Sequence, residues 1–162
     1  MIDSLLALAA ELSVKVNANE ADLRRATSTA YYTAFHALCE MLADQMIPLK
    51  KSPLDVRLSR LYVRVYRSVK HEHIWKRDLF QNSDATKTVQ TSLDNLRQKR
   101  IEADYIPLTF PYLSTEVNDF ISEARETVAN IRALNEADRL SLTVNMLIGP
   151  EKPETGQKKN TK

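Results

Sequence analysis

The chain contains only two glycines, Gly149 and Gly156, and both lie in its last fourteen residues. Glycine is the usual residue wherever the backbone needs a positive φ, as in the tight turns of β-hairpins. The preceding 148 residues therefore favour an all-α fold, an antiparallel bundle of four to six helices. The same absence excludes the glycine-dependent phosphate and nucleophile motifs. Any activity of this stretch has to come from side chains on helix faces.

Length and charge narrow the class of protein further. A chain of 162 residues predicts one domain, and such a domain can bury a core without a disulfide or a metal. The single cysteine, Cys39, predicts a buried, reduced thiol, and we expect a cytoplasmic protein without a signal peptide or membrane span. The net charge of +2 means that a nucleic-acid function would need a local basic patch.

Apolar residues repeat with helical spacing along most of the chain. Asp3 and Asn19 are the expected N-caps of the first two helices, the second with Asp22 as a capping-box partner. The remaining helices are expected at 54–71, from 83 or 84 to 104, from 114 to about 131, and from a cap at Asn135 to 147. Together they form one domain, residues 1–148, followed by a disordered tail, residues 149–162.

Several apolar residues are assigned to the core by these patterns. Residues 72–83 are expected to form a loop or a broken turn whose Trp75, Leu79 and Phe80 pack inward. In the helices the residues assigned to the core include Leu54, Leu58, Leu61, Val65, Val69 and Ala85. The sixth helix is expected to carry Leu140, Leu142, Val144 and Leu147.

The most informative feature is a run of positive charge between residues 50 and 77. It holds nine lysines and arginines against two acids, and it begins with Lys50 and Lys51. Within the expected third helix, basic residues recur at spacings of three and four and fall within an arc of roughly 80°; they are Arg57, Arg60, Arg64, Arg67 and His71. This stripe fits a solvated or acid-paired face, an RNA- or phosphate-binding surface, or a protein interface.

Two histidines, His71 and His73, stand at the end of this stripe. In a continuous helix His71 would follow Arg67 by one turn and Arg64 by two, and neighbouring guanidiniums would lower its pKa. A neutral imidazole can act as a general base while arginine stabilises an anionic transition state. These are the groups that cleavage of RNA through its own 2′-hydroxyl requires. The spacing does not favour a metal site, and we expect no cofactor.

Two further groups have structural interpretations. Tyr31, Tyr32 and His36 lie within one helical segment and predict a partly buried tyrosine–histidine network. Arg100 falls near an apolar stripe, with Asp104 one turn later, and the two predict an ion pair that closes the helix. The alternative for Arg100 is that it faces a cleft shared with the basic stripe.

Three segments together resemble the HEPN superfamily, in bacterial forms with an RRAxSTAYYxxFH helix, a YRxxxH segment and an RxxADY helix end. They are Leu23–His36, Val65–His71 and Arg100–Tyr105, and the resemblance spans roughly residues 20–135. It implies a four- to five-helix bundle that commonly forms a homodimer. Many members are metal-independent endoribonucleases of toxin–antitoxin and anti-phage defence systems, with an Arg/His site at the dimer cleft.

The family signature, Arg-x4–6-His, has more than one match in this chain. Arg67 with His73 and Arg64 with His71 fit that spacing, whereas the YRxxxH form selects Arg67 and His71. We therefore expect catalytic roles for Arg64, Arg67, His71 and His73, and RNA or phosphate contacts from Arg57, Arg60, Lys70 and Arg100.

The resemblance also bears on partners. It implies RNA and an antitoxin or nucleotidyltransferase partner protein. Toxins controlled by such a nucleotidyltransferase carry a tyrosine shortly after the motif histidine, and Ile74 and Trp75 stand there instead. We therefore do not expect that regulation. Because some members only bind RNA, nucleotides or partner subunits, a non-catalytic binding module is the alternative.

Overall fold

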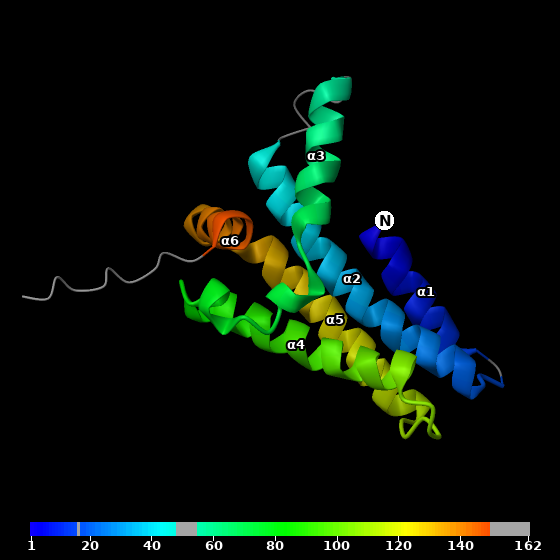
Figure 1. Ribbon diagram of the computed structural model, residues 1–162. Coiled ribbons are helices and arrows are strands. Elements are labelled where there is room, and N and C mark those ends of the chain that lie inside the picture. Colours follow the sequence, from blue (N-terminus) through cyan, green and yellow to red (C-terminus); the bar gives the residue numbers. More distant parts are fainter. Residues whose placement is uncertain (16, 48–54, 150–162) are drawn as a thin grey trace, which may run out of the picture.

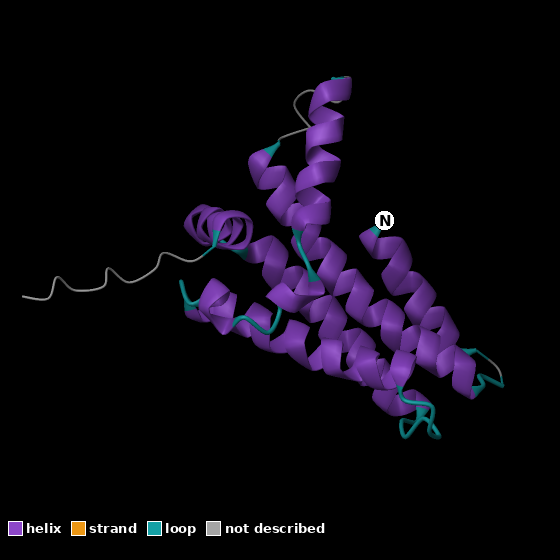
Figure 2. Cartoon of the chain, viewed as in Figure 1, coloured by secondary structure: helices purple, strands orange, loops and turns teal. Residues whose placement is uncertain are grey.

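The protein is all-helical in a computed structural model that describes residues 1–15, 17–47 and 55–149. Six α-helices form a helical bundle, and the described residues contain no strand (Figures 1 and 2). The helices are α1 (Ile2–Val14), α2 (Glu20–Met46), α3 (Val56–Ser68), α4 (Asp84–Tyr105), α5 (Ser114–Ala133) and α6 (Glu136–Ile148). The tail expected at 149–162 lies outside the described residues apart from Gly149, as do Val16, Lys50, Lys51 and Leu54.

The central element is α2, whose 27 residues extend about 40 Å. It packs against α1, α3, α4, α5 and α6. Buried alanines along it, among them Ala26, Ala30 and Ala34, allow neighbouring backbones to approach closely. Helices α1 and α2 run antiparallel, as do α4 and α5, whereas α3 stands out from the bundle beside the end of α2 (Figure 1).

Most helix starts follow the predicted caps. The Asn19 side chain accepts a hydrogen bond from the Asp22 backbone, and the Asp22 carboxylate accepts one from the Asn19 backbone, which completes a capping box. Ser83 and Asn135 cap α4 and α6 in the predicted places. The predicted N-cap of α1 is wrong, because this helix begins at Ile2 and Asp3 lies inside its first turn.

The third helix ends three residues earlier than predicted. After Ser68 the chain adopts an extended conformation at Val69 and Lys70, and His71–His73 form a short 3₁₀ turn, η2. Val69 and Ile74 are both buried, and a chain that continued as a helix along α2 could not insert them into the core. The Gln90 side chain then holds this connection by donating to the Ile74 carbonyl at 2.8 Å.

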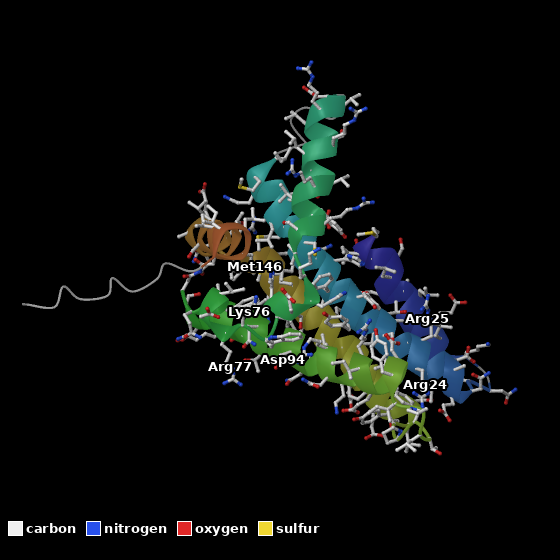
Figure 3. All side chains as sticks on the ribbon, in the orientation of Figure 1. Arg24, Arg25, Lys76, Arg77, Asp94 and Met146 are labelled. Carbon is white, nitrogen blue, oxygen red and sulfur yellow. The ribbon has the colours of Figure 1, made fainter. Side chains whose placement is uncertain are left out.

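A second 3₁₀ turn, η3 (Arg77–Phe80), completes the connection to α4. Leu79 and Phe80 are buried as predicted, but Trp75 is 51% exposed, and the Arg97 guanidinium covers one face of its ring at 4.6 Å. Figure 3 shows the neighbouring Lys76 and Arg77 with Asp94 of α4 on this side of the bundle. The inward prediction for Trp75 is therefore wrong.

Other residues predicted to be in the core are exposed, because the apolar side of the helix does not always face its neighbours. Leu61 is 45% exposed, because α3 packs on α2 through Tyr62 and Tyr66. Ala85 is also exposed. Cys39 is a buried free thiol as expected, and burial raises its pKa to about 12.

Among the described residues, no helix has the length and apolar character needed to cross a membrane.

Candidate functional site

The basic face of α3, which we define as Arg57, Arg60, Arg64 and Arg67, is exposed along its length. Asp55 caps the start of this helix with its carboxylate on the backbone of Arg57 and Leu58. None of the four guanidiniums forms a hydrogen bond or ion pair with another described residue. Their mutual repulsion is relieved only by solvent, so this face favours an anionic ligand.

His71 lies beneath α3, in contact with aromatic side chains of α2. Its Nδ1 and the Tyr31 hydroxyl oxygen are 2.7 Å apart and share a hydrogen bond. The imidazole lies 4.2 Å from the Phe35 ring and 5.8 Å from Tyr32 between ring centroids. Within the described part of the chain, Nε2 of His71 has no hydrogen-bond partner, and it is not buried. This nitrogen is the part of the ring that a ligand can reach.

Arg100 lies next to this histidine, held by two contacts. Its Nη2 donates to the Tyr32 hydroxyl at 2.5 Å, and its Nε lies 2.7 Å from Oδ2 of Asp104. The Arg100 side chain is only 14% exposed, and the Ser28 hydroxyl in turn donates to Asp104. The predicted Arg100–Asp104 pair is therefore confirmed, and Tyr32 links it to the ring of His71.

The surroundings of His71 favour the neutral form of its imidazole. Burial lowers its pKa first, and the positive charge of Arg100 and the proximity of His36 lower it further. Burial also raises the pKa of Tyr31, so this phenol remains protonated.

His36 forms a second tyrosine–histidine pair near the first. Its Nδ1 lies 2.7 Å from the Tyr66 hydroxyl, and its ring stacks on those of Tyr32 and Tyr66. The rings of Tyr31, Tyr32 and His36 pack together as predicted, but their hydrogen bonds go to His71, Arg100 and Tyr66 rather than to one another. The sequence did not indicate these partners. The available signal was the position of Tyr31 one turn before Phe35, which aims both rings at the same neighbour.

The structure separates the histidines from the basic face. Because α3 ends at Ser68, His71 is not one helical turn beyond Arg67, and no hydrogen bond joins it to Arg64 or Arg67. His73 accepts a long hydrogen bond of 3.4 Å at Nδ1 from the Lys70 backbone. Burial and the charge of Lys76 lower the pKa of His73.

The predicted residues therefore fall into two groups. The four arginines of the basic face lie on α3, whereas His71 and Arg100 both contact Tyr32 of α2 and form what we call the His71 centre, together with Tyr31, Tyr32 and Phe35. Lys70 and His73 lie in the connection between the two. No group of three or more His, Cys, Asp or Glu side chains in the described ranges is placed to hold a metal ion.

Comparison with known proteins adds no relative: no family model, no curated protein and no solved structure matches the chain.

Proposed function

We propose that the protein is a metal-independent endoribonuclease of the HEPN type, which binds RNA along the basic face of α3 and cleaves it at the His71 centre. The observation that carries the proposal is the basic face itself, four exposed guanidiniums without an acidic partner among the described residues. Arginine forks match phosphate oxygens in a bidentate manner, and RNA supplies phosphates at regular intervals. The chain runs directly from this face to His71.

The reaction needs only groups that RNA and the protein supply. The 2′-hydroxyl loses its proton to a base and attacks the adjacent phosphorus, while the bond to the 5′-oxygen breaks and that oxygen takes up a proton. The products end in a 2′,3′-cyclic phosphate and a 5′-hydroxyl. Neutral imidazoles are suited to accept the first proton, and Arg100 is suited to stabilise the additional negative charge on phosphorus.

The remaining charged residues have binding roles in this proposal. Arg57 and Arg60 hold phosphates away from the scissile bond, whereas Arg64, Arg67 and Lys70 hold those nearer to it. A homodimer would bring two such faces together, and an antitoxin protein would act by covering them. These partners rest on the resemblance of the sequence segments described above.

A second candidate is a helical module that binds RNA without cleaving it. The contact that favours it is the Tyr31–His71 hydrogen bond, because it occupies one nitrogen of the histidine that catalysis would use. The separation of His71 from Arg64 and Arg67 by the end of α3 favours it as well.

Cleavage of labelled RNA in EDTA distinguishes the two candidates. We expect cleavage products with a cyclic phosphate end, no cleavage of DNA with the same sequence, and a loss of at least about 100-fold in rate for His71→Gln and Arg100→Gln. Arg125→Gln, at an exposed position on α5, is the matched control and should cleave normally. RNA that binds and remains intact would overturn the nuclease and leave the binding module.

Binding is tested separately by charge reversal. We expect the double variant Arg60→Glu/Arg64→Glu to weaken RNA binding and to flatten the dependence of log K on log salt by about 1.4, because each lost phosphate contact contributes roughly 0.7 for single strands. The control Arg125→Glu/Arg132→Glu changes net charge equally, at exposed positions on α5. Equal loss of binding in both variants would show that total charge, rather than the basic face, attracts RNA.

A further inference from the structure

Tyr31 is completely buried, yet its hydroxyl contacts a histidine whose Nε2 has no hydrogen-bond partner among the described residues. The side chain is 0% exposed, and its oxygen has a single hydrogen-bond partner among the described residues, Nδ1 of His71. The ring is fixed by neighbours on both sides, since it lies 5.9 Å from Phe35 and 5.5 Å from Tyr32 between centroids. The hydroxyl therefore has no alternative direction in which to donate.

The shared hydrogen bond can be arranged in two ways. If Tyr31 donates to Nδ1, the phenol proton is used, and the proton of the neutral imidazole lies on Nε2, where solvent accepts it. If Nδ1 donates to Tyr31 instead, the phenol proton is left buried without an acceptor. A buried donor without a partner is disfavoured by a factor of roughly ten or more in population. The first arrangement therefore dominates.

We propose that Tyr31 is a positioning residue that holds neutral His71 with its proton on Nε2, so that this N–H and the Arg100 guanidinium bind the same RNA phosphate group. The inference rests on the proposed function and deepens it. In this state His71 is a hydrogen-bond donor to a phosphate oxygen, in the manner of oxyanion stabilisation. His73, the other histidine with an expected catalytic role, is then the base that accepts the 2′-hydroxyl proton.

The Tyr66–His36 pair provides an internal comparison. Its oxygen and nitrogen are also 2.7 Å apart, but Tyr66 is only partly buried, in contrast to Tyr31. Because this side chain is only partly buried, reversal of the hydrogen bond costs less for His36 than for His71. The geometry therefore fixes the tautomer of His71 and leaves that of His36 free.

Long-range proton–nitrogen NMR correlations of nitrogen-15-labelled histidine report which ring nitrogen carries the proton. Near neutral pH we expect His71 to show a protonated Nε2 and an unprotonated Nδ1. Tyr31→Phe should replace this by a mixture of both tautomers, while near-ultraviolet circular dichroism verifies that the ring still packs. Tyr66→Phe is the matched control, and it should change His36 and leave the His71 tautomer as it is.

Addition of single-stranded RNA then tests the phosphate contact. We expect the Nε2 signal of His71 to shift in the wild type, and Tyr31→Phe to weaken binding by about twofold, because an equal mixture leaves about half of the molecules with the proton on Nε2. A protonated Nδ1 in the wild type, or an Nε2 signal that stays in place when RNA saturates the protein, overturns the inference. The proposed cleavage can fail independently of this inference. In that case the bound RNA remains intact, while the Nε2 signal of His71 still shifts.

Discussion

At the scale of single residues, the two adjacent arginines at the start of α2 have opposite environments. Arg24 donates from Nη1 to the carbonyls of Glu102, Ala103 and Ile106, and from Nη2 to that of Leu108. Arg25 is exposed, and its side chain has no partner among the described residues (Figure 3). Arg24 thus satisfies the terminal carbonyls of α4, where positive charge is favourable.

We expect Arg24→Ala to lower the free energy of unfolding by about 2–4 kcal/mol, because several charged hydrogen bonds to buried or terminal carbonyls are lost together. Arg25→Ala removes the same atoms one residue later and should change it by less than about 0.5 kcal/mol. Urea denaturation of both variants measures the difference. Similar losses for the two would show that Arg24 does not hold the end of α4.

The histidines predict a loss of stability on mild acidification. Burial lowers the pKa of His36, His71 and His73 in the folded protein, with Arg100 acting on His71 and Lys70 and Lys76 on His73. Below about pH 6.5 the unfolded chain takes up protons that the folded protein still refuses, so stability is complete above that value and falls as pH decreases towards the folded pKa values.

Urea midpoints between about pH 7.5 and 5.5 test this expectation. The midpoint of the wild type should fall across the window, and His71→Gln should reduce the fall, because glutamine does not titrate. A midpoint that rises on acidification, or an unchanged fall in His71→Gln, would show that carboxylates rather than this histidine control the response.

At the scale of elements, α6 shows what a helical pattern can and cannot predict. Its cap at Asn135 and its extent followed from local chemistry, which a sequence displays directly. Its buried face did not, because Leu140, Leu142 and Val144 alternate and cannot all point inward on a helix. The structure buries Leu142 with Met146, one turn apart, and leaves Leu140 51% exposed. Only the position of the neighbouring helices selects between such faces.

Leu140 and Leu142 therefore form a matched pair on one helix. Leu142→Ala should cost about 2–5 kcal/mol, the usual effect of deleting buried methyl groups, because the side chain is fully buried. Leu140→Ala should cost less than about 1 kcal/mol, since its side chain is half in solvent and alanine is a good helix former. Thermal and urea denaturation measure both. Equal costs would mean that α6 is rotated about its axis.

The candidate site was predictable to the extent that it is local. Arg100 and Asp104 are one turn apart, so their ion pair followed from spacing. Tyr31 and His71 are forty residues apart, and their hydrogen bond depends on where α3 ends. That end is determined by burial of Val69 and Ile74, a tertiary effect that basic and apolar periodicity along 54–71 does not show.

At the scale of the whole molecule, stability is distributed unevenly. Helix α2 carries fifteen buried residues and packs on every other α-helix. Helix α3 has no buried residue, and its one extensive packing partner among the described elements is α2. Four unpaired guanidiniums add repulsion within α3. Segments with few buried contacts open at lower free energy than the rest of a domain, and ligand-binding elements are commonly among them.

Native-state hydrogen exchange should therefore separate α3 from the bundle. We expect the amides of α3 beyond its first turn to exchange at least about 100-fold faster than those of α2 around Leu38, because α3 opens without global unfolding. Added RNA should slow exchange in α3 and leave α5 unchanged, since binding would neutralise the repulsion and order the helix. The double variant Arg60→Glu/Arg64→Glu, which places two acidic side chains between Arg57 and Arg67, should slow exchange in α3 without RNA. If α3 exchanged as slowly as α2, it would be part of the cooperative core, and the basic face would be a rigid surface rather than one that RNA stabilises.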